Sequence, residues 1–372
     1  MAGFEFTKYV TYEDNGNIIA IRGLNCKNGS LDLRDVKYID NSDFSKLSRS
    51  KLYTGDILYT YVGTVGEVAV VDKNDKYYLA PNVSRIRLSK DYNSDFIKQL
   101  LGSKKFYNQI VFPLIATSSQ PALSMENLRK FKLKVPSIRE QTKIASLLNA
   151  IDERIATQNK IIDKLQSLIK GIMVELQKQG VDKGTWKKVF LSDVLTERNE
   201  RNTNLFQVFS VSVSQGVVNQ VDYLGRSFAA KDTSKYNVVH YGDLVYTKSP
   251  TGSFPYGIVK QSLNLENVAV SPLYGVYKPK SLAVGAYLHE YFMSEINTHN
   301  YLHPLIQKGA KNTINITNQR FLENCVLLPT NINELLQISK LLRSLNNKIK
   351  YQQDILQQYQ KQKQYLLRQM FI

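Results

Sequence analysis

Apolar residues recur along residues 144–176 at steps that alternate between four and three positions. These positions are Ile144, Leu148, Ile151, Ile155, Gln158, Ile162, Leu165, Ile169, Ile172 and Leu176, of which Gln158 is the one polar exception. Such a spacing is typical of a helix that packs one narrow face, called the seam below, against another helix. The sequence therefore predicts a long helix over residues 137–180. It begins at a capping box of Ser137 and Glu140 and ends at Gly180.

The same spacing appears again 194 residues later. These positions are Ile338, Leu342, Leu345, Ile349, Gln352, Leu356, Tyr359, Lys363, Leu366 and Met370. A similar helix start recurs at Asn331 and Glu334. Two independent surface helices would each expose a long apolar stripe, so we expect the two seams to be partners. In an antiparallel pair, Gln158 and Gln352 should lie close together near mid-length, where a buried polar pair can fix the register.

Short runs of β-type residues separated by turn sequences precede the first long helix. They predict strands at residues 18–22, 57–61, 68–71, 84–88 and 131–135, and a helix over residues 94–110. The second half repeats this plan. Matching positions are Asn28-Gly29 with Gln215-Gly216, Gly55-Asp56 with Gly242-Asp243, Phe96–Leu101 with Tyr287–Phe292, and Ser124–Leu128 with Thr317–Phe321. The offset grows from 187 to 191 to 194, which indicates small insertions in the second copy.

The repeat predicts a mixed α/β domain followed by a long helix, used twice in one α+β chain. The predicted stretches are a first domain at residues 1–136, a helix at 137–180, a second domain at 181–329 and a helix at 330–372. One difference between the copies is clear. The second copy opens with a predicted strand at residues 185–191, for which the first copy has no room. The first domain therefore lacks this edge strand or borrows one from near the C-terminus.

Amino-acid composition and charge limit the classes of protein to which this chain can belong. The chain has 372 residues, of which 43% are hydrophobic, so folded domains are expected. The net charge of +17 is spread along the chain and favours a polyanionic partner. No apolar run approaches the roughly 18 residues of a membrane span, and no signal-peptide pattern is present. Cys26 and Cys325 form neither a disulfide framework nor a metal cluster, which fits a reducing cytoplasm.

Motifs of catalysis are absent from the sequence. There is no Gly-x-Gly for a nucleotide or S-adenosylmethionine loop, and no Gly-Lys for a Walker A loop. Ser253–Tyr256 superficially resembles a methyltransferase motif, but we interpret it as part of a turn. Glu295, His299 and His303 have a metal-ligand spacing without a fourth ligand, so a polar helix face is the preferred interpretation. We expect no cofactor, no metal and no catalytic activity.

These features resemble the specificity subunit of type I restriction–modification enzymes. The resemblance spans essentially the whole chain and rests on the repeated order of several short motifs. They are Gly55-Asp56, Gly63–Gly66, Leu133–Pro136, Glu140–Ile144 and Leu147–Asp152. The resemblance implies a non-catalytic cytoplasmic protein in which each domain is a target-recognition domain that reads one half of a split sequence in double-stranded DNA. It also implies an antiparallel coiled coil of the two long helices. Two methyltransferase subunits and, in the full complex, restriction subunits would assemble around it.

Base reading in the major groove needs hydrogen-bonding side chains on loops. The first domain offers Thr117, Ser118, Ser119 and Gln120, and the second offers Lys308, Lys311, Asn312 and Thr313 at the equivalent place. A further pair of loops holds Tyr59, Tyr61 and Thr64, and Lys248, Ser249 and Thr251. Solvated loops without a DNA role are the alternative for each residue. For the whole chain, the alternatives are a nucleic-acid-binding scaffold without sequence specificity and an enzyme with an unrecognised active site.

Overall fold

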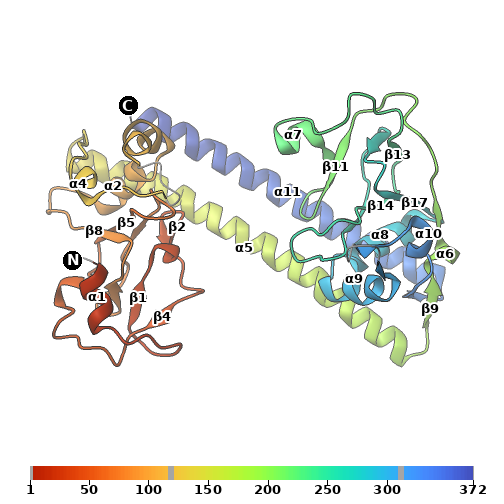
Figure 1. Cartoon of the computed structure of the whole chain (residues 1–372), viewed down its shortest axis with the longest axis horizontal. Helices are drawn as coiled ribbons and strands as arrows, with labels where there is room; N and C mark the ends of the chain where they lie inside the picture. Colours follow the sequence, from red (N-terminus) through yellow and green to blue (C-terminus); the bar gives the residue numbers. More distant parts are fainter. Residues whose placement is uncertain (1–2, 116–120, 309–313, 372) are drawn as a thin grey trace. The chain divides into compact units, whose positions relative to one another are not determined.

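The computed structural model describes residues 3–115, 121–308 and 314–371 (Figure 1). The chain forms two compact units. The first unit comprises Met1–Asn159 and Ile355–Ile372, and the second unit comprises Lys160–Asp354. The long helices α5 (Ile138–Asp182) and α11 (Ile332–Met370) each contribute one part to each unit. None of the described helices combines the length and apolar composition needed to cross a membrane.

The first unit contains two small sheets and a hairpin. Its strands are β1 (Ile19–Ile21), β2 (Cys26–Lys27), β3 (Ser30–Leu31), β4 (Lys37–Tyr38), β5 (Ile57–Thr60), β6 (Val68–Val70), β7 (Tyr77–Leu79) and β8 (Val83–Ile86). One sheet has the order β6-β5-β8 and is antiparallel, the other has the order β4-β1-β7, and β2 pairs with β3. Strands were expected at or near β1, β5, β6 and β8, because these runs are β-branched and aromatic.

The first unit's helices are shorter than expected. They are α1 (Gly3–Tyr9), α2 (Ser94–Leu101), α3 (Lys104–Phe106), a π-turn at Tyr107–Val111 and α4 (Met125–Arg129), with 3-10 turns at Gly23–Asn25, Ser48–Ser50 and Phe112–Leu114. The single helix expected over residues 94–110 was wrong. Ser103 adopts an extended conformation, and its hydroxyl accepts a 3.2 Å hydrogen bond from the Phe106 amide. This N-cap starts a new helix and thereby interrupts the old one.

The strand expected at residues 131–135 was also wrong, because these residues form no strand. In the second unit the equivalent segment is β20 (Cys325–Pro329), which pairs along its length with β9 (Trp186–Phe190). Among the described residues, no strand pairs with residues 131–135. A strand without a partner leaves its backbone groups unpaired, so the segment stays irregular.

The second unit repeats the plan with additions. Its other strands are β10 (Leu195–Glu197), β11 (Phe209–Ser212), β12 (Gly216–Asn219), β13 (Asn237–Val239), β14 (Leu244–Tyr246), β15 (Val259–Gln261), β16 (Val268–Val270), β17 (Gly275–Pro279), β18 (Gln307–Lys308) and β19 (Ile314–Asn315). Its helices are α6 (Leu191–Val194), α7 (Gln220–Leu224), α8 (Leu282–Tyr291), α9 (Glu295–Leu302) and α10 (Asn318–Phe321), with a 3-10 turn at His303–Leu305. The main sheet has the order β10-β17-β14-β15.

Strand register shows how closely the copies agree. In the first unit Ile57 pairs with Val70 and Ile86, and in the second Leu244 pairs with Gln261 and Tyr277. The offsets between these equivalent positions are 187 and 191, as the sequence repeat required. Three strands of each unit are therefore the same structural element used twice, and β10 has no paired equivalent among the described residues of the first unit.

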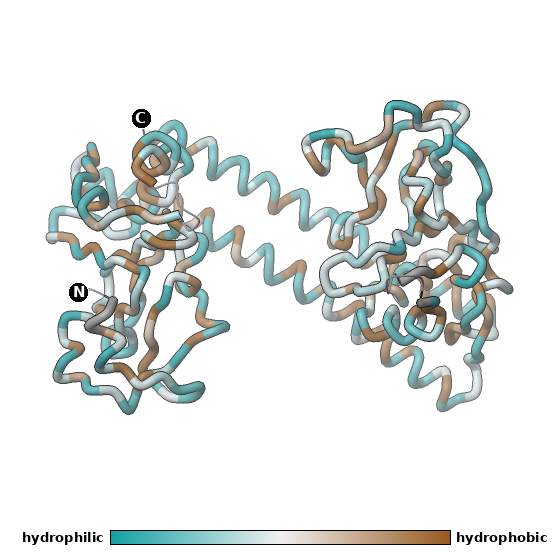
Figure 2. Tube along the Cα trace, viewed as in Figure 1, coloured by the Kyte–Doolittle hydropathy of each residue, from teal (hydrophilic) through white to brown (hydrophobic). Residues whose placement is uncertain are grey.

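The seam faces inward on both long helices. All ten positions of each seam are buried or half-buried, and apolar and polar residues alternate along the two helices in Figure 2. In the first unit, Lys363 Nζ lies 2.5 Å from Asp152 Oδ1, and Arg154 lies 3.4 Å from the Tyr359 hydroxyl. Rising numbers on α5 thus meet falling numbers on α11, so these segments run antiparallel.

The two polar seam positions belong to different units. Gln158 is buried in the first unit, and Gln352 is half-buried in the second. Their proximity stays a prediction.

The expected helix boundaries were partly correct. Ser137 and Glu140 form the capping box: the Ser137 amide donates to Glu140 Oε2 at 3.1 Å, and the Glu140 amide donates to Ser137 Oγ at 3.4 Å. Glu334 accepts instead from Trp186 Nε1 at 2.8 Å. Gly180 does not end α5, which continues to Asp182. A Cβ atom at Gly180 would lie 2.1 Å from the Trp186 ring, so close packing explains this glycine.

Candidate nucleic-acid interface

A buried aspartate anchors the turn before the central strand of each unit. Asp56 is 2% exposed and accepts two 2.7 Å hydrogen bonds from Arg87 and one of 2.9 Å from the Tyr53 amide. The preceding Gly55 has a φ of +88°, which favours glycine. Because the carboxylate is fully paired and enclosed, it positions the strand entry and has no free acceptor for DNA.

The second unit builds the same anchor with a different arginine. Asp243 is 1% exposed and accepts from Arg198 at 2.6 and 3.1 Å and from the His240 amide at 2.8 Å. Gly242 has a φ of +90°. Arg198 follows β10, the added strand, whereas Arg87 follows β8. The turn geometry is therefore shared while the source of the positive charge differs.

In the first unit, backbone hydrogen bonds join the loop after β5 to residues 121–123. The Gly63 amide donates to the Pro121 carbonyl at 3.0 Å, and the Leu123 amide donates to the Tyr61 carbonyl at 2.8 Å. The loop after β5 is therefore held against residues 121–123. These residues directly follow Thr117, Ser118, Ser119 and Gln120, which lie outside the described residues.

Of the three residues proposed after β5, Tyr59 must be corrected. Its side chain is fully buried, its ring packs 5.9 Å from that of Phe131, and burial raises the pKa of its hydroxyl. Strand alternation places it on the core side with Ile57. Tyr61 is half-buried, and Thr64 is exposed while its carbonyl accepts from the Thr60 hydroxyl. Thr64 is therefore the most accessible side chain of the three.

In the second unit, the residues after β14 form a tight turn. Lys248 has a φ of +62° and is half-buried, and burial lowers the pKa of its ammonium group. A Cβ atom on Gly257 would lie 2.7 Å from the Lys248 amide nitrogen, so this backbone approach requires glycine. Ser249 is exposed, and Thr251 pairs with Phe254. Ser249 and Thr251 remain available candidates, whereas Lys248 is partly enclosed.

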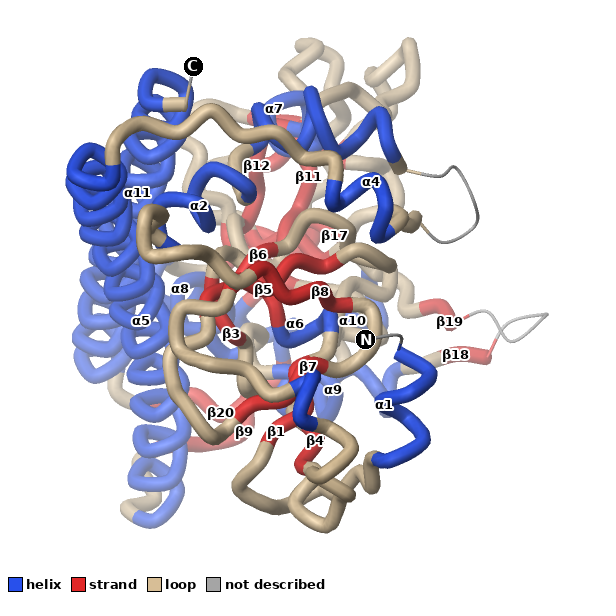
Figure 3. Tube along the Cα trace, turned by 90° about the vertical axis from the view of Figure 1, so that its left-hand side faces the viewer, coloured by secondary structure: helices blue, strands red, loops and turns tan. Residues whose placement is uncertain are grey.

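The last proposed loop lies between two paired strands. β18 and β19 form a two-stranded ladder in which Lys308 pairs with Ile314 (Figure 3). Lys311, Asn312 and Thr313 lie outside the described residues.

Sequence reasoning did not assign a cluster of ring side chains beside these loops. His299 and His303 stack at 5.1 Å between ring centroids, and Tyr256 packs on both at 5.3 and 6.0 Å. Ser253 also bonds to Glu295, so the turn at 253–256 rests on α9. The four-residue spacing of the histidines was visible in the sequence, but the contact with Tyr256 is non-local. The described residues contain no group of His, Cys, Asp and Glu placed to hold a metal ion.

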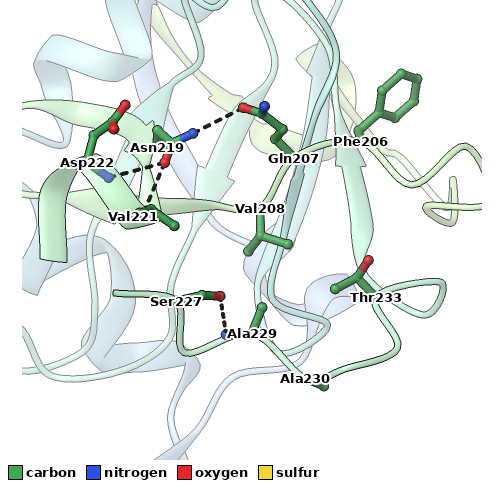
Figure 4. A pocket seen from close by; sticks show the side chains of 10 residues that line it. All are labelled: Phe206, Gln207, Val208, Asn219, Val221, Asp222, Ser227, Ala229, Ala230 and Thr233. Carbon is green, nitrogen blue, oxygen red and sulfur yellow. Dashed lines mark hydrogen bonds between the residues drawn. The ribbon is translucent and has the colours of Figure 1, made fainter. Parts of the chain in front are cut away.

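A hollow of about 480 Å³ lies between the β11–β12 hairpin, α7 and the segment 227–233 (Figure 4). Several of its polar atoms are used internally. Asn219 Oδ1 caps α7 by accepting from the Val221 and Asp222 amides at 2.9 and 3.3 Å, and Asn219 Nδ2 donates to Gln207 at 3.1 Å. The polar atoms of Asn219 are therefore committed to bonds within the chain.

Comparisons with known proteins agree with this architecture. Residues 4–167 match the family described as Type I restriction modification DNA specificity domain. A putative type I restriction enzyme MjaX specificity subunit from Methanocaldococcus jannaschii is 26% identical over 41% of this chain. The EcoKI specificity subunit from Escherichia coli is 25% identical over 40% of this chain. The matched stretches cover only 37% and 34% of the two relatives.

The fold extends the comparison to nearly the whole chain. A crystal structure of a type I restriction–modification system S subunit from M. genitalium has a TM-score of 0.61 and 12% identity, and covers 98% of this chain and 91% of that one. Sequence and fold together confirm the resemblance to type I specificity subunits. The expected α+β architecture of two similar domains with long helices is confirmed as well.

Proposed function

We propose that the chain is the DNA sequence-recognition subunit of a type I restriction–modification complex. In this proposal each globular domain reads one half of a bipartite target, and the helices set the spacer. The observation that carries it is the duplicated scaffold, in which β6-β5-β8 and β15-β14-β17 have equivalent registers but lead into different loops. Identical supports with different loops suit two half-sites of different sequence. The net charge of +17 suits a phosphate backbone.

The proposed role is non-catalytic. Methylation and cleavage would be carried out by partner subunits, which bring their own cofactors. In agreement with this, the buried aspartates Asp56 and Asp243 are committed to arginines. The purified chain alone should therefore not methylate DNA, and it should support adenine methylation once a partner methyltransferase is added.

The proposal is tested by a domain exchange. Residues 1–136 are replaced by the matching domain of a related subunit, and methylation by the reconstituted complex is measured on a library of targets. One half of the recognised sequence should change while the other half stays. The competing proposal, a scaffold without sequence specificity, predicts equal competition by unrelated duplex DNA. Such competition would refute base reading.

Partner docking has its own support. Ile138 and Leu147 on α5 are both 44% exposed, and the residues 194 positions later on α11, Ile332 and Leu341, are 59% and 44% exposed. Exposed apolar side chains at repeated positions fit two copies of the same partner. We therefore propose that one methyltransferase subunit docks at the start of each long helix. Restriction subunits would join this core.

Leu147→Glu should remove one of two bound methyltransferase copies, and Leu341→Glu should remove the other. Mass photometry of the reconstituted complex gives the stoichiometry directly. Leu168→Glu is the matched control, because Leu168 is 48% exposed on the same helix as Leu147 but its repeat counterpart is Gln362. Unchanged stoichiometry in both variants would place the docking surface elsewhere.

A further inference from the structure

A carboxyl–amide contact joins the globular domain of each unit to a long helix. In the first unit, Gln99 Nε2 on α2 donates to Asp152 Oδ2 on α5 at 2.6 Å. In the second unit, Asn346 Nδ2 on α11 donates to Glu290 Oε1 on α8 at 2.5 Å. Gln99 and Glu290 are 5% and 7% exposed, whereas the Asp152 side chain is 34% exposed, so each contact has one buried and one half-buried partner.

The repeat shows that these are the same two positions. Gln99 and Glu290 are related by the offset of 191, which also relates α2 to α8. Asp152 and Asn346 are related by the offset of 194, which relates the two seams. The acid is therefore on the helix in the first unit and on the domain in the second.

In the first unit the carboxylate that takes part in the contact and the cation paired with it both belong to the long helices. Asp152 is paired with Lys363 of α11 at 2.5 Å. On the domain side, Lys98 donates to Asn149 at 3.2 Å and to Asp95 at 2.9 Å. The domain thus presents a neutral amide, Gln99, to a carboxylate that already has its cation.

In the second unit the charges belong to the domain. Lys260 on β15 is 3% exposed and interacts electrostatically with Glu290. The repeat counterpart of Lys260 is Ala69, and that of Lys363 is Ile169, and both are buried and apolar. His289, which precedes the glutamate, accepts from the Gln261 amide at 3.0 Å through Nδ1. The helix side presents the neutral Asn346.

We propose that these exchanged contacts act as a pairing code that assigns each globular domain to its own helix. Because the two units share a scaffold, a domain could dock on the wrong helix, within one chain or between two copies. The second domain on α5 would place Glu290 against Asp152, and two carboxylates in a half-buried contact repel each other. The code goes beyond DNA reading, since it disfavours docking of either domain on the other domain's helix, in the same chain or in a second copy.

The local part of the proposal is tested by thermal unfolding of the full chain. Gln99→Glu opposes the half-buried Asp152, which Lys363 already neutralises in part, and should lower the midpoint of the first unit by about 2–4 °C at pH 8. The loss should shrink toward pH 5, where the carboxyl pair can take up a proton. Adding Asp152→Asn restores an acid–amide contact and should recover most of the loss. Gln109→Glu and Glu153→Gln make the same chemical changes at exposed sites and serve as controls. A pH-independent loss without rescue would overturn the code.

The pairing itself is tested by domain exchange between copies. Two differently tagged chains are unfolded together and refolded, and the fraction that purifies with the other tag is measured. Gln99→Glu with Asp152→Asn gives both units the same code, and so does Glu290→Gln with Asn346→Asp. Each pair should raise the exchanged fraction several-fold over the unmutated chain.

The chain with all four changes has two distinct codes again and should return to the original exchanged fraction. If one double variant does not refold, the other still carries the comparison. Equal exchange in all chains, or exchange in the fourfold variant as high as in the doubles, would overturn the proposal. Since no DNA or partner is present, the outcome does not depend on the proposed function.

Discussion

Lengthening both long helices by one heptad tests whether they set the distance between half-sites. The boundary between the two units falls after Asn159 in α5 and after Asp354 in α11. Seven residues inserted after each of these positions keep both seams in phase, because the seam repeats every seven residues. The insertions also leave the contacts within each unit, such as those of Gln99 and Asn346, unchanged.

The expected size of the effect follows from helix geometry. Seven residues at about 1.5 Å each add roughly 10 Å to each helix. At about 3.4 Å per base pair, this equals about three base pairs of DNA. The preferred target should therefore contain about three more unread bases. Three base pairs also add about 100° of twist, so recovery of activity should be partial.

The assay is methylation by the reconstituted complex on targets whose spacer length varies by single base pairs. A five-residue insertion in each helix is the control, because it rotates the seam by about 140° away from its partner and should lower stability without a new spacer optimum. An unchanged spacer preference in the heptad variant would refute the reasoning. The helices would then hold partners only, and another element would set the distance.

Three further predictions concern single residues. Gly180→Ala should destabilise the chain by about 1–3 kcal/mol, because the new methyl group would lie 2.1 Å from a tryptophan ring. Gly171 has no atom within 4 Å of such a methyl group, so Gly171→Ala should stabilise the chain by about 0.5–1 kcal/mol. Denaturant titration measures both changes in the free energy of unfolding. Burial lowers the pKa of Lys260 to about 8, so the unfolded state binds more protons between about pH 8 and 10.5, and stability relative to Lys260→Met should rise across that window. In methylation assays, Thr64→Ala should weaken discrimination at one base pair by about 1–3 kcal/mol, whereas Tyr59→Phe should leave it unchanged because Tyr59 is buried.

Local patterns in the sequence located the two long helices and the turn before the central strand of each unit. The alternating seam located both long helices, since a helical face must be buried along its whole length. Gly55-Asp56 and Gly242-Asp243 marked the same turn in each copy, because a positive φ and a capping carboxylate are both local requirements. Ser137 and Glu140 likewise marked a helix start.

Non-local contacts decided the features that the sequence did not reveal. Glycine is common at helix ends, but Gly180 lies inside α5, where Trp186 packs against it. Residues 131–135 have strand character, yet without a partner they form no strand. Tyr59 was proposed to contact DNA because its side chain can form hydrogen bonds. Its position in β5, however, directs the side chain into the core. In each case the deciding neighbour is far away in the sequence.

The two copies differ most where a contact has two possible sources. Asp56 and Asp243 occupy the same turn, but the arginine of Asp56 follows β8, whereas that of Asp243 follows β10, which has no equivalent among the described strands of the first unit. The carboxyl–amide contacts differ in the same way: the acid lies on the long helix in the first unit and on the globular domain in the second. A duplicated scaffold must keep the geometry of each contact but not the residue that supplies it. Once the partners differ, the halves are no longer interchangeable. That loss of equivalence is what a chain needs if each half is to face its own DNA sequence.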